Sequence, residues 1–138
     1  MVLGVAAFAV MAALSLTSAG ATSAKAVRSA SHISIRSHGL RFSGRVTSPS
    51  VGCLSERSVT LYRTNGDVLG STRTDQRGHW HIQAQGSAGI TMGQFYAKVH
   101  QLTRESHNPR LHTSFVCEPA MSKAVPSRPD HRADAAQG

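Results

Sequence analysis

Apolar and polar residues alternate along most of the chain between residues 32 and 125, with the period of two that is typical of half-buried β-strands. The clearest run spans residues 40–46, where one face carries apolar residues or glycine and the other carries arginine and serine. The same alternation places a further set of side chains on an inner face: Ile33, Ile35, Val59, Leu61, Trp80, Ile82, Phe95, Ala97 and Val99. No stretch of this region follows the 3.6-residue period of an amphipathic helix. The pattern predicts an all-β protein.

Turn-forming residues divide this alternation into short strands. The tripeptide Asn65-Gly66-Asp67 is a strong hairpin signal between two strand patterns. Leu111–Cys117 and Met121–Val125 are predicted as closing strands, and the longer segments Ser48–Glu56 and Leu102–Arg110 as loops at the ends of the sheets. About seven short strands, separated by Gly, Ser, Asn and Pro clusters, are typical of an antiparallel β-sandwich.

The two ends of the chain differ in composition from the strand region. Residues 1–24 contain no charged side chain, and their apolar run ends in the small residues Ser18–Ala21, which is typical of a secretory signal peptide. The run is short for a membrane span, so we expect a secreted, extracellular protein without a transmembrane segment in the mature chain. Residues 25–31 are predicted as a polar spacer, 32–125 as the sandwich domain and 126–138 as a disordered tail.

Cys53 and Cys117 are the two cysteines of the chain. In an oxidising compartment, a single pair in a small domain predicts a disulfide bond. Closing a loop of this length removes denatured-state entropy worth about 4 kcal/mol. The alternative is a pair of free thiols or metal ligands, although no second Cys or His completes a CxxC-type spacing.

The segment from Thr74 to Ile82 follows the pattern T-D-x-x-G-x-[aromatic]-x-[aliphatic]. Asp75 can accept hydrogen bonds from backbone N–H groups inside a turn, Gly78 can take a positive φ, and Trp80 then enters the core. This pattern resembles that of transthyretin-like, or carboxypeptidase-regulatory-like, domains, which are Ig-like β-sandwiches. The resemblance implies that Thr74, Asp75, Gly78 and Trp80 are structural residues of an Ig-like sandwich.

More narrowly, the order of motifs from Gly44 to Cys117 resembles that of small exported bacterial proteins, especially of actinobacteria, which carry one such domain and two cysteines. The resemblance covers about half of the chain and implies a fold rather than an activity. An intradiol dioxygenase of related architecture needs two Tyr and two His on iron, whereas Tyr62 and Tyr96 both fall inside ordinary strand patterns.

Three histidines are candidate metal ligands. His79 and His81 are one residue apart on a predicted strand, so both imidazoles project from one face, and His100 from a nearby strand is a possible third ligand for Zn²⁺ or Cu²⁺. The alternative, which we favour, is that they are solvated polar residues on the outer face, because they alternate with Trp80 and Ile82.

The charge balance raises the question of an anionic partner. The chain has Lys+Arg 15 against Asp+Glu 7, for a net charge of +8. Seven arginines in the first half of the domain alternate with core residues and predict one basic sheet face: Arg36, Arg41, Arg45, Arg57, Arg63, Arg73 and Arg77. Among them we choose Arg41, Arg45, Arg63 and Arg73 as candidates for binding an anionic surface. Specific nucleic-acid recognition is not expected, because export removes the usual target and stacking aromatics are few.

These observations predict a secreted, non-enzymatic β-sandwich module that binds a partner or has a structural role at the cell envelope or outside the cell. Its partner would be an anionic envelope polymer or another extracellular protein, and no cofactor is expected. Two alternatives stay open. One is a His-dependent extracellular metal-binding protein, and the other is a small secreted hydrolase or an enzyme inhibitor that presents the loop Leu102–Arg110.

Overall fold

The computed structural model describes residues 20, 26–84, 93–105 and 114–127. Apart from one 3-10 turn, η1 (Val51–Cys53), the regular structure of these residues consists of strands. They are β1 (Val27–Ser29), β2 (His32–Ile33), β3 (Arg36–His38), β4 (Arg41–Thr47), β5 (Ser58–Arg63), β6 (Val68–Arg73), β7 (His79–Gln83), β8 (Gln94–Val99), β9 (Leu102–Glu105), β10 (Ser114–Cys117), β11 (Ala120–Met121) and β12 (Val125–Pro126). The prediction of an all-β fold is confirmed.

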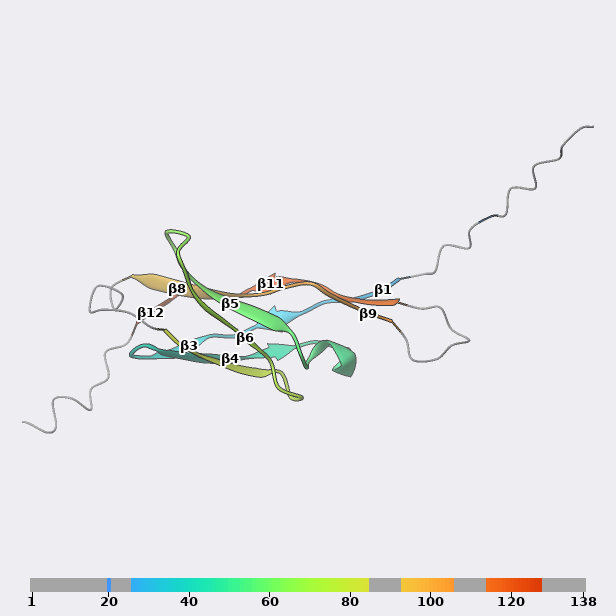
Figure 1. Cartoon of the computed structure of the whole chain (residues 1–138), viewed down its shortest axis with the longest axis horizontal. Helices are drawn as coiled ribbons and strands as arrows, with labels where there is room; N and C mark the ends of the chain where they lie inside the picture. Colours follow the sequence, from blue (N-terminus) through green and yellow to red (C-terminus); the bar gives the residue numbers. More distant parts are fainter. Residues whose placement is uncertain (1–19, 21–25, 85–92, 106–113, 128–138) are drawn as a thin grey trace, which may run out of the picture.

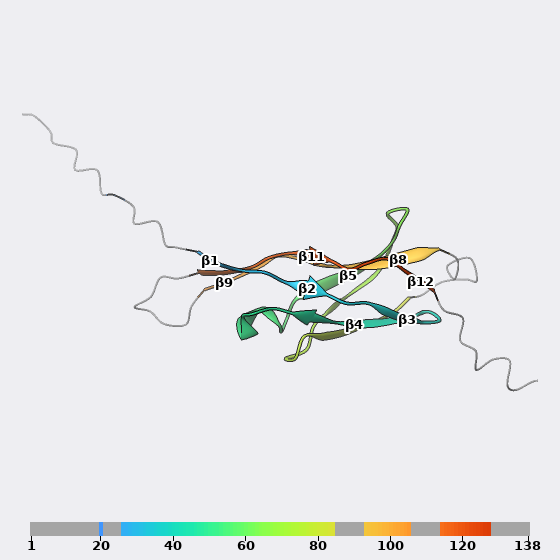
Figure 2. The same cartoon turned by 180° about the vertical axis from the view of Figure 1, so that it is seen from behind.

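The strands of the body form two layers (Figures 1 and 2). In the first sheet, β4 is central, β2 and β3 pair with one of its edges, and β7 pairs with the other. In the second sheet the order is β6, β5 and β8, and both β11 and β12 pair with the remaining edge of β8. This antiparallel two-sheet arrangement agrees with the predicted sandwich.

The structure has more strands than the sequence predicts, because three long runs are broken. The first run contains β1 to β3, the second contains β8 and β9, and the third contains β10 to β12. Three of the breaks lie where a run exchanges one partner for another; the first run, for example, leaves β10 and joins β4. The break between β2 and β3 and the break between β11 and β12 interrupt pairing with a single partner, β4 and β8 respectively. When the pieces are joined, the twelve segments of the described residues make seven runs, which agrees with the predicted number of about seven. The membership differs, because the sequence predicts separate closing strands where β10 to β12 form one run and a loop where β9 continues β8.

The core lies between the two sheets and contains the inward side chains that the alternation predicts. Its buried members are Ile33, Phe42, Val46, Val59, Leu61, Trp80, Ile82, Ala84, Phe95, Ala97 and Val99. Phe42 and Phe95 join the layers, with ring centroids 5.0 Å apart. Trp80 is 2% exposed. It packs beside Gly44, where a Cβ would lie 2.9 Å from the indole ring and would collide with the backbone carbonyl of Ser34.

Both predicted turns are confirmed in their geometry. Gly66 has a φ of +98° in the hairpin between β5 and β6, and its N–H donates to the carbonyl of Arg63. Before β7, Asp75 Oδ1 accepts hydrogen bonds from the N–H groups of Arg77 and His79 at 2.8 and 2.9 Å. Gly78 has a φ of +84°, and a Cβ there would collide with the carbonyl oxygen of Val46.

A three-stranded ribbon of β1, β10 and β9 extends beyond the two-layer body (Figure 1). Strand β1 runs parallel to β10, and β9 runs antiparallel to it. The prediction of a loop over Leu102–Arg110 is therefore wrong for Leu102–Glu105, which is β9, while residues 106–110 lie outside the described part of the chain. Only one of the four β9 residues is apolar, so the strand depends on its ladder with β10 rather than on burial.

The predicted disulfide bond is confirmed. Cys53 in η1 and Cys117 in β10 are bonded, with their Cα atoms 5.4 Å apart, and both are fully buried. Residues 48–56 form the connection in which η1 lies, as expected for a loop at the end of a sheet. The bond therefore ties this loop to the base of the ribbon.

The boundaries of the folded region differ slightly from the predicted ones. Strand β1 lies within the predicted spacer, residues 25–31, where Ser29 and Ser31 are buried although they are polar. Pro126, assigned to the tail, pairs with Gln94 in β12. The predicted signal peptide lies outside the described residues except for Gly20, as does the tail beyond residue 127. Among the described residues, no helix is long and apolar enough to cross a membrane.

Candidate binding surface

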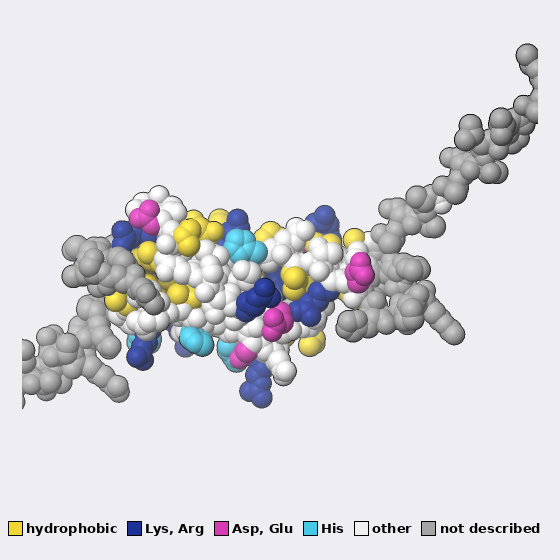
Figure 3. Space-filling model, viewed as in Figure 1, with side chains coloured by type: hydrophobic (Ala, Val, Ile, Leu, Met, Phe, Trp, Pro, Cys, Tyr) yellow, Lys and Arg dark blue, Asp and Glu magenta, His cyan; other side chains and the backbone are white. Residues whose placement is uncertain are grey.

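The outward face of the first sheet carries a cluster of exposed basic and polar side chains, which we call the basic face: Arg36, His38, Arg41, Ser43, Arg45, His79, His81 and Gln83. They share this face because side chains alternate across each strand and their neighbours point into the core. Across the sheet, Arg41 lies between His38 and Gln83, Ser43 lies between Arg36 and His81, and Arg45 lies beside His79. In Figure 3, dark blue and cyan side chains project from the lower edge of the body, beneath the layer that contains β3 and β4.

Two arginines of the basic face are held in place through their Nε atoms. Arg41 Nε–H donates to Gln83 Oε1 at 3.1 Å, and Arg45 Nε–H donates to the carbonyl of Arg77 at 3.2 Å. Within the described part of the chain, the terminal nitrogens of both guanidinium groups have no partner. Those nitrogens form the fork that binds phosphate or carboxylate oxygens. Both guanidinium groups are therefore oriented by Nε, and no other described residue uses their terminal donors.

Two shallow hollows lie side by side on the basic face. The first has a volume of about 510 Å³ and is lined by His38, Arg41, Ser43, His81 and Gln83, together with Phe42 and Ile82. The second, of about 330 Å³, is lined by Ser34, Arg36, Ser43, Arg45 and His79, together with Gly44 and Trp80. Ser43 belongs to both hollows. Each hollow is thus bordered by arginine, histidine and hydroxyl groups.

Negative charge is scarce on this face. Strands β2, β3, β4 and β7 contain no Asp or Glu. One carboxylate of the described residues contacts the face: Asp75, in the turn before β7, whose Oδ2 lies 3.3 Å from Nδ1 of His79. The backbone N–H of His79, followed by that of Arg77 and the His79 ring, lowers the pKa of Asp75 despite a smaller opposing effect of desolvation. Asp75 is therefore ionised at neutral pH and engaged by the backbone of its own turn and by His79.

The four arginines chosen from the sequence do not lie on one surface. Arg41 and Arg45 are on the basic face, where Arg36 joins them. Arg63 is in β5, half-buried, with its guanidinium carbon 5.9 Å from the Phe95 ring centroid and Nη1 3.8 Å from Asp67. Arg73 is in β6 and forms an ion pair with Glu56 at 3.5 Å. The single basic sheet face is therefore smaller than the sequence predicts.

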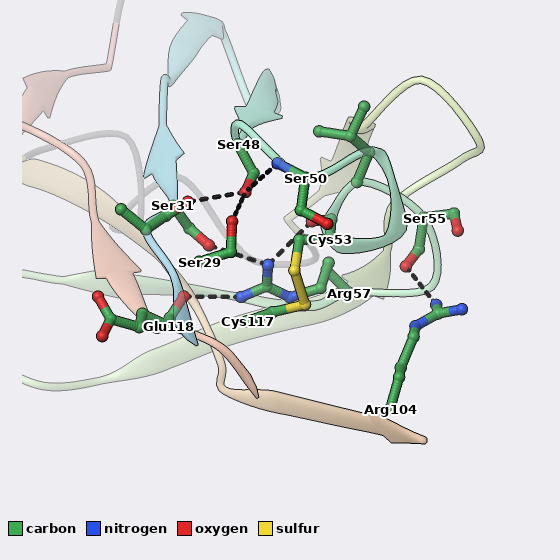
Figure 4. Close-up of a disulfide and its surroundings, with 12 residues drawn as sticks. Ser29, Ser31, Ser48, Ser50, Cys53, Ser55, Arg57, Arg104, Cys117 and Glu118 are labelled. Atoms are coloured by element: carbon green, nitrogen blue, oxygen red, sulfur yellow. Dashed lines mark hydrogen bonds between the residues drawn. A yellow bond between two sulfur atoms is a disulfide. The ribbon is translucent and has the colours of Figure 1, made fainter. Parts of the chain in front are cut away.

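Arg57 is a second correction, because it does not face outward at all. Its side chain is fully buried beside the disulfide (Figure 4). Nη1 donates to Ser31 Oγ at 3.0 Å and to the Cys53 carbonyl at 2.9 Å, and Nη2 donates to the carbonyls of His100 and Glu118, both at 2.9 Å. No carboxylate among the described residues pairs with it. Burial and then the charge of Arg104 lower the pKa of the Arg57 guanidinium from its usual value.

The partners of Arg57 show what this buried cation does. Ser31 lies at the break between β1 and β2, His100 at the break between β8 and β9, and Glu118 at the break between β10 and β11. A carbonyl at such a break has lost its place in a ladder, and an unpaired buried carbonyl is costly. Arg57 therefore replaces ladder bonds where the ribbon leaves the body. Thr74 holds the backbone of Arg57 in place, because Thr74 Oγ1 accepts a hydrogen bond from the backbone N–H of Arg57 at 2.9 Å.

The structure separates the three histidines that the sequence proposes as metal ligands. His79 and His81 project together from β7, whereas His100 follows β8 in the second sheet and its Nε2 lies 2.9 Å from Thr60 Oγ1. Among the described residues, no group of three or more His, Cys, Asp or Glu side chains is placed to hold a metal ion. The pair on β7 is instead part of the basic face.

Comparisons with family models, with curated proteins and with solved structures find no match for this chain.

Proposed function

We propose that the protein is a secreted, non-enzymatic binding module, and that its basic face binds an anionic polymer at the cell envelope or outside the cell. The observation that carries this proposal is the arrangement of Arg36, Arg41 and Arg45 on a sheet face whose strands contain no acidic residue. The guanidinium groups of Arg41 and Arg45 support it further, because Nε of each is hydrogen-bonded and the terminal nitrogens have no partner among the described residues. The transthyretin-like affiliation belongs to the same proposal, supported by the Asp75–Gly78 turn and the buried Trp80.

A polymer suits this face better than a single small anion. An exposed ion pair contributes only about 0–1 kcal/mol, so one contact cannot retain a ligand. Several contacts made by one chain add up, because after the first contact the next anionic group is already held nearby. The flat, repeated pattern of basic side chains therefore favours an extended ligand with many charges.

The two alternatives have less support. A metal-binding protein would depend on His79 and His81 alone among the described residues, because His100 lies in the other sheet. A hydrolase or an inhibitor would have to present the segment Leu102–Arg110 as a loop, but its first four residues form strand β9. The histidines of the basic face do not require a metal-binding role, since an imidazole N–H can donate a hydrogen bond to an anion.

The proposal is tested by retention of the purified full chain on immobilised dextran sulfate, with neutral dextran as the blank. We expect wild type to be retained and to elute with salt, since exposed charges are screened. The double variant Arg41→Ala, Arg45→Ala should elute at clearly lower salt. The matched control, Arg28→Ala with Arg73→Ala, removes the same charge from exposed arginines that pair with Glu118 and Glu56 elsewhere, and should elute like wild type.

Two results would contradict the proposal. If wild type passes through both columns at low salt, the protein does not bind polyanions. If the two double variants shift elution equally, retention reflects net charge and the basic face has no special role. Far-ultraviolet circular dichroism of each variant shows whether the fold is intact before the columns are compared.

A further inference from the structure

The two hollows of the basic face share part of their lining, although His38 and Gln83 belong only to the first and Arg36 and Ser34 only to the second, where His79 also contacts Asp75. Strand β4 supplies Arg-x-Ser-x-Arg from Arg41 to Arg45, and β7 supplies His-x-His from His79 to His81. Because both strands run in register, each hollow receives an arginine from β4 and a histidine from β7, and Ser43 lies between them. We propose that the hollows are neighbouring subsites for successive phosphodiester groups of one linear polymer, an inference that rests on the proposed function.

The spacing of the subsites sets the class of polymer. The hollows are offset by two residues along β4, which corresponds to about 7 Å at the usual rise of a strand. An extended polymer with one phosphodiester for every three-carbon unit can place successive charges at this interval. Phosphates joined directly to one another lie closer together, and a chain with one charge per disaccharide spaces its charges farther apart. This interval fits a backbone with three carbons between successive phosphodiesters, and the basic face contains no Phe, Tyr or Trp on which bases could stack. The two observations together favour a polymer of the glycerol phosphate type over a nucleic acid.

The direction of the donors favours phosphodiester over carboxylate. Each hollow offers two kinds of donor, the terminal nitrogens of a guanidinium that reaches from β4 toward β7 and the imidazole of a β7 histidine. A tetrahedral phosphodiester presents oxygens in several directions and can accept from donors of different orientation, whereas a carboxylate presents its two oxygens in one plane. The guanidinium fork also matches two phosphate oxygens at once.

The test compares synthetic glycerol phosphodiester oligomers that contain one or two phosphodiester groups, with affinity for the full chain measured by calorimetry at low salt. We expect the two-phosphate oligomer to bind about tenfold tighter or more, because the second contact is intramolecular. Arg41→Ala or Arg45→Ala alone should reduce its affinity to that of the one-phosphate compound. Arg73→Ala, on the other sheet, should leave the tenfold gain unchanged.

The possible results separate this inference from the proposed function. Equal affinity for the two oligomers, with retention on dextran sulfate that still depends on Arg41 and Arg45, overturns the paired subsites and leaves the basic face as a general polyanion surface. Binding to phosphatidylglycerol vesicles that matches the two-phosphate oligomer at equal phosphate would overturn the assignment to a linear polymer. Loss of dextran sulfate binding in wild type overturns both proposals.

Discussion

The hydrogen bonds of the buried Arg57 guanidinium predict that replacing this residue lowers the free energy of unfolding. In Arg57→Met the apolar stem keeps most of the volume, but the Ser31 hydroxyl and the carbonyls of Cys53, His100 and Glu118 lose their donors. Each buried acceptor left unpaired costs about 1–3 kcal/mol. Replacing the buried cation also removes its desolvation penalty of several kcal/mol, which offsets only part of the cost of the unpaired acceptors. We expect a net loss of about 3 kcal/mol, a large fraction of the 5–15 kcal/mol typical of a whole domain.

The measurement is urea denaturation at neutral pH with the disulfide intact, compared with Arg73→Met as an exposed control that should change stability by less than about 0.5 kcal/mol. Arg57→Lys should fall between wild type and Arg57→Met, because one ammonium cannot reach carbonyls on all sides. Amide hydrogen exchange should show faster opening of β9 and β10 than of β5 in Arg57→Met. A midpoint for Arg57→Met equal to or above that of wild type would show that desolvation outweighs the acceptors, and the reasoning about broken ladders would be wrong.

Three further predictions concern the core, the disulfide and the turn. Trp80→Ala should cost about 3–5 kcal/mol because it leaves a cavity in the core, and a urea midpoint close to wild type would contradict this. Replacing Cys53 and Cys117 by serine should cost about 4 kcal/mol; an unchanged thermal midpoint would count against the bridge as a stabiliser. Asp75, whose pKa is lowered in the folded protein, contributes stability that is present above its unfolded pKa and is lost as the pH falls below about 4. The stability difference between wild type and Asp75→Asn should therefore shrink from pH 6 to pH 2, and a constant difference would refute the linkage.

The alternation of apolar and polar residues was sufficient to predict the body of the fold. Strands β4, β7 and β8 each bury every second side chain, so their positions and inward faces follow from the sequence. The ribbon was harder to predict because β1 and β9 contain few apolar residues and are stabilised by backbone ladders with β10. Backbone hydrogen bonds leave no pattern in the order of side chains. The cysteine pair indicated that the loop and the last long run meet, but not that three strands extend beyond that point.

The arginines show how the same residue type takes two roles according to its place in the pleat. Arg57 and Arg63 lie two residues before Val59 and two residues after Leu61, so the period of two already assigns both to the inner side of β5. Their positive charge is the reason that an outward position was expected instead. The alternation of the strand therefore indicated an inward position for both arginines, and the expectation that charged residues face outward was wrong.

The candidate site follows from the same register. Arg36, Arg41 and Arg45 occupy positions that alternate with Ser37, Phe42 and Val46, and the burial of those neighbours leaves the arginines no direction except outward. On β7 the burial of Trp80 and Ile82 turns His79 and His81 to the same side. Packing of the core thus brings the arginines of the basic face together although their positive charges repel one another. Such a repulsion is relieved by an anion, and a ligand that binds there should raise the unfolding midpoint of wild type more than that of the Arg41→Ala, Arg45→Ala variant.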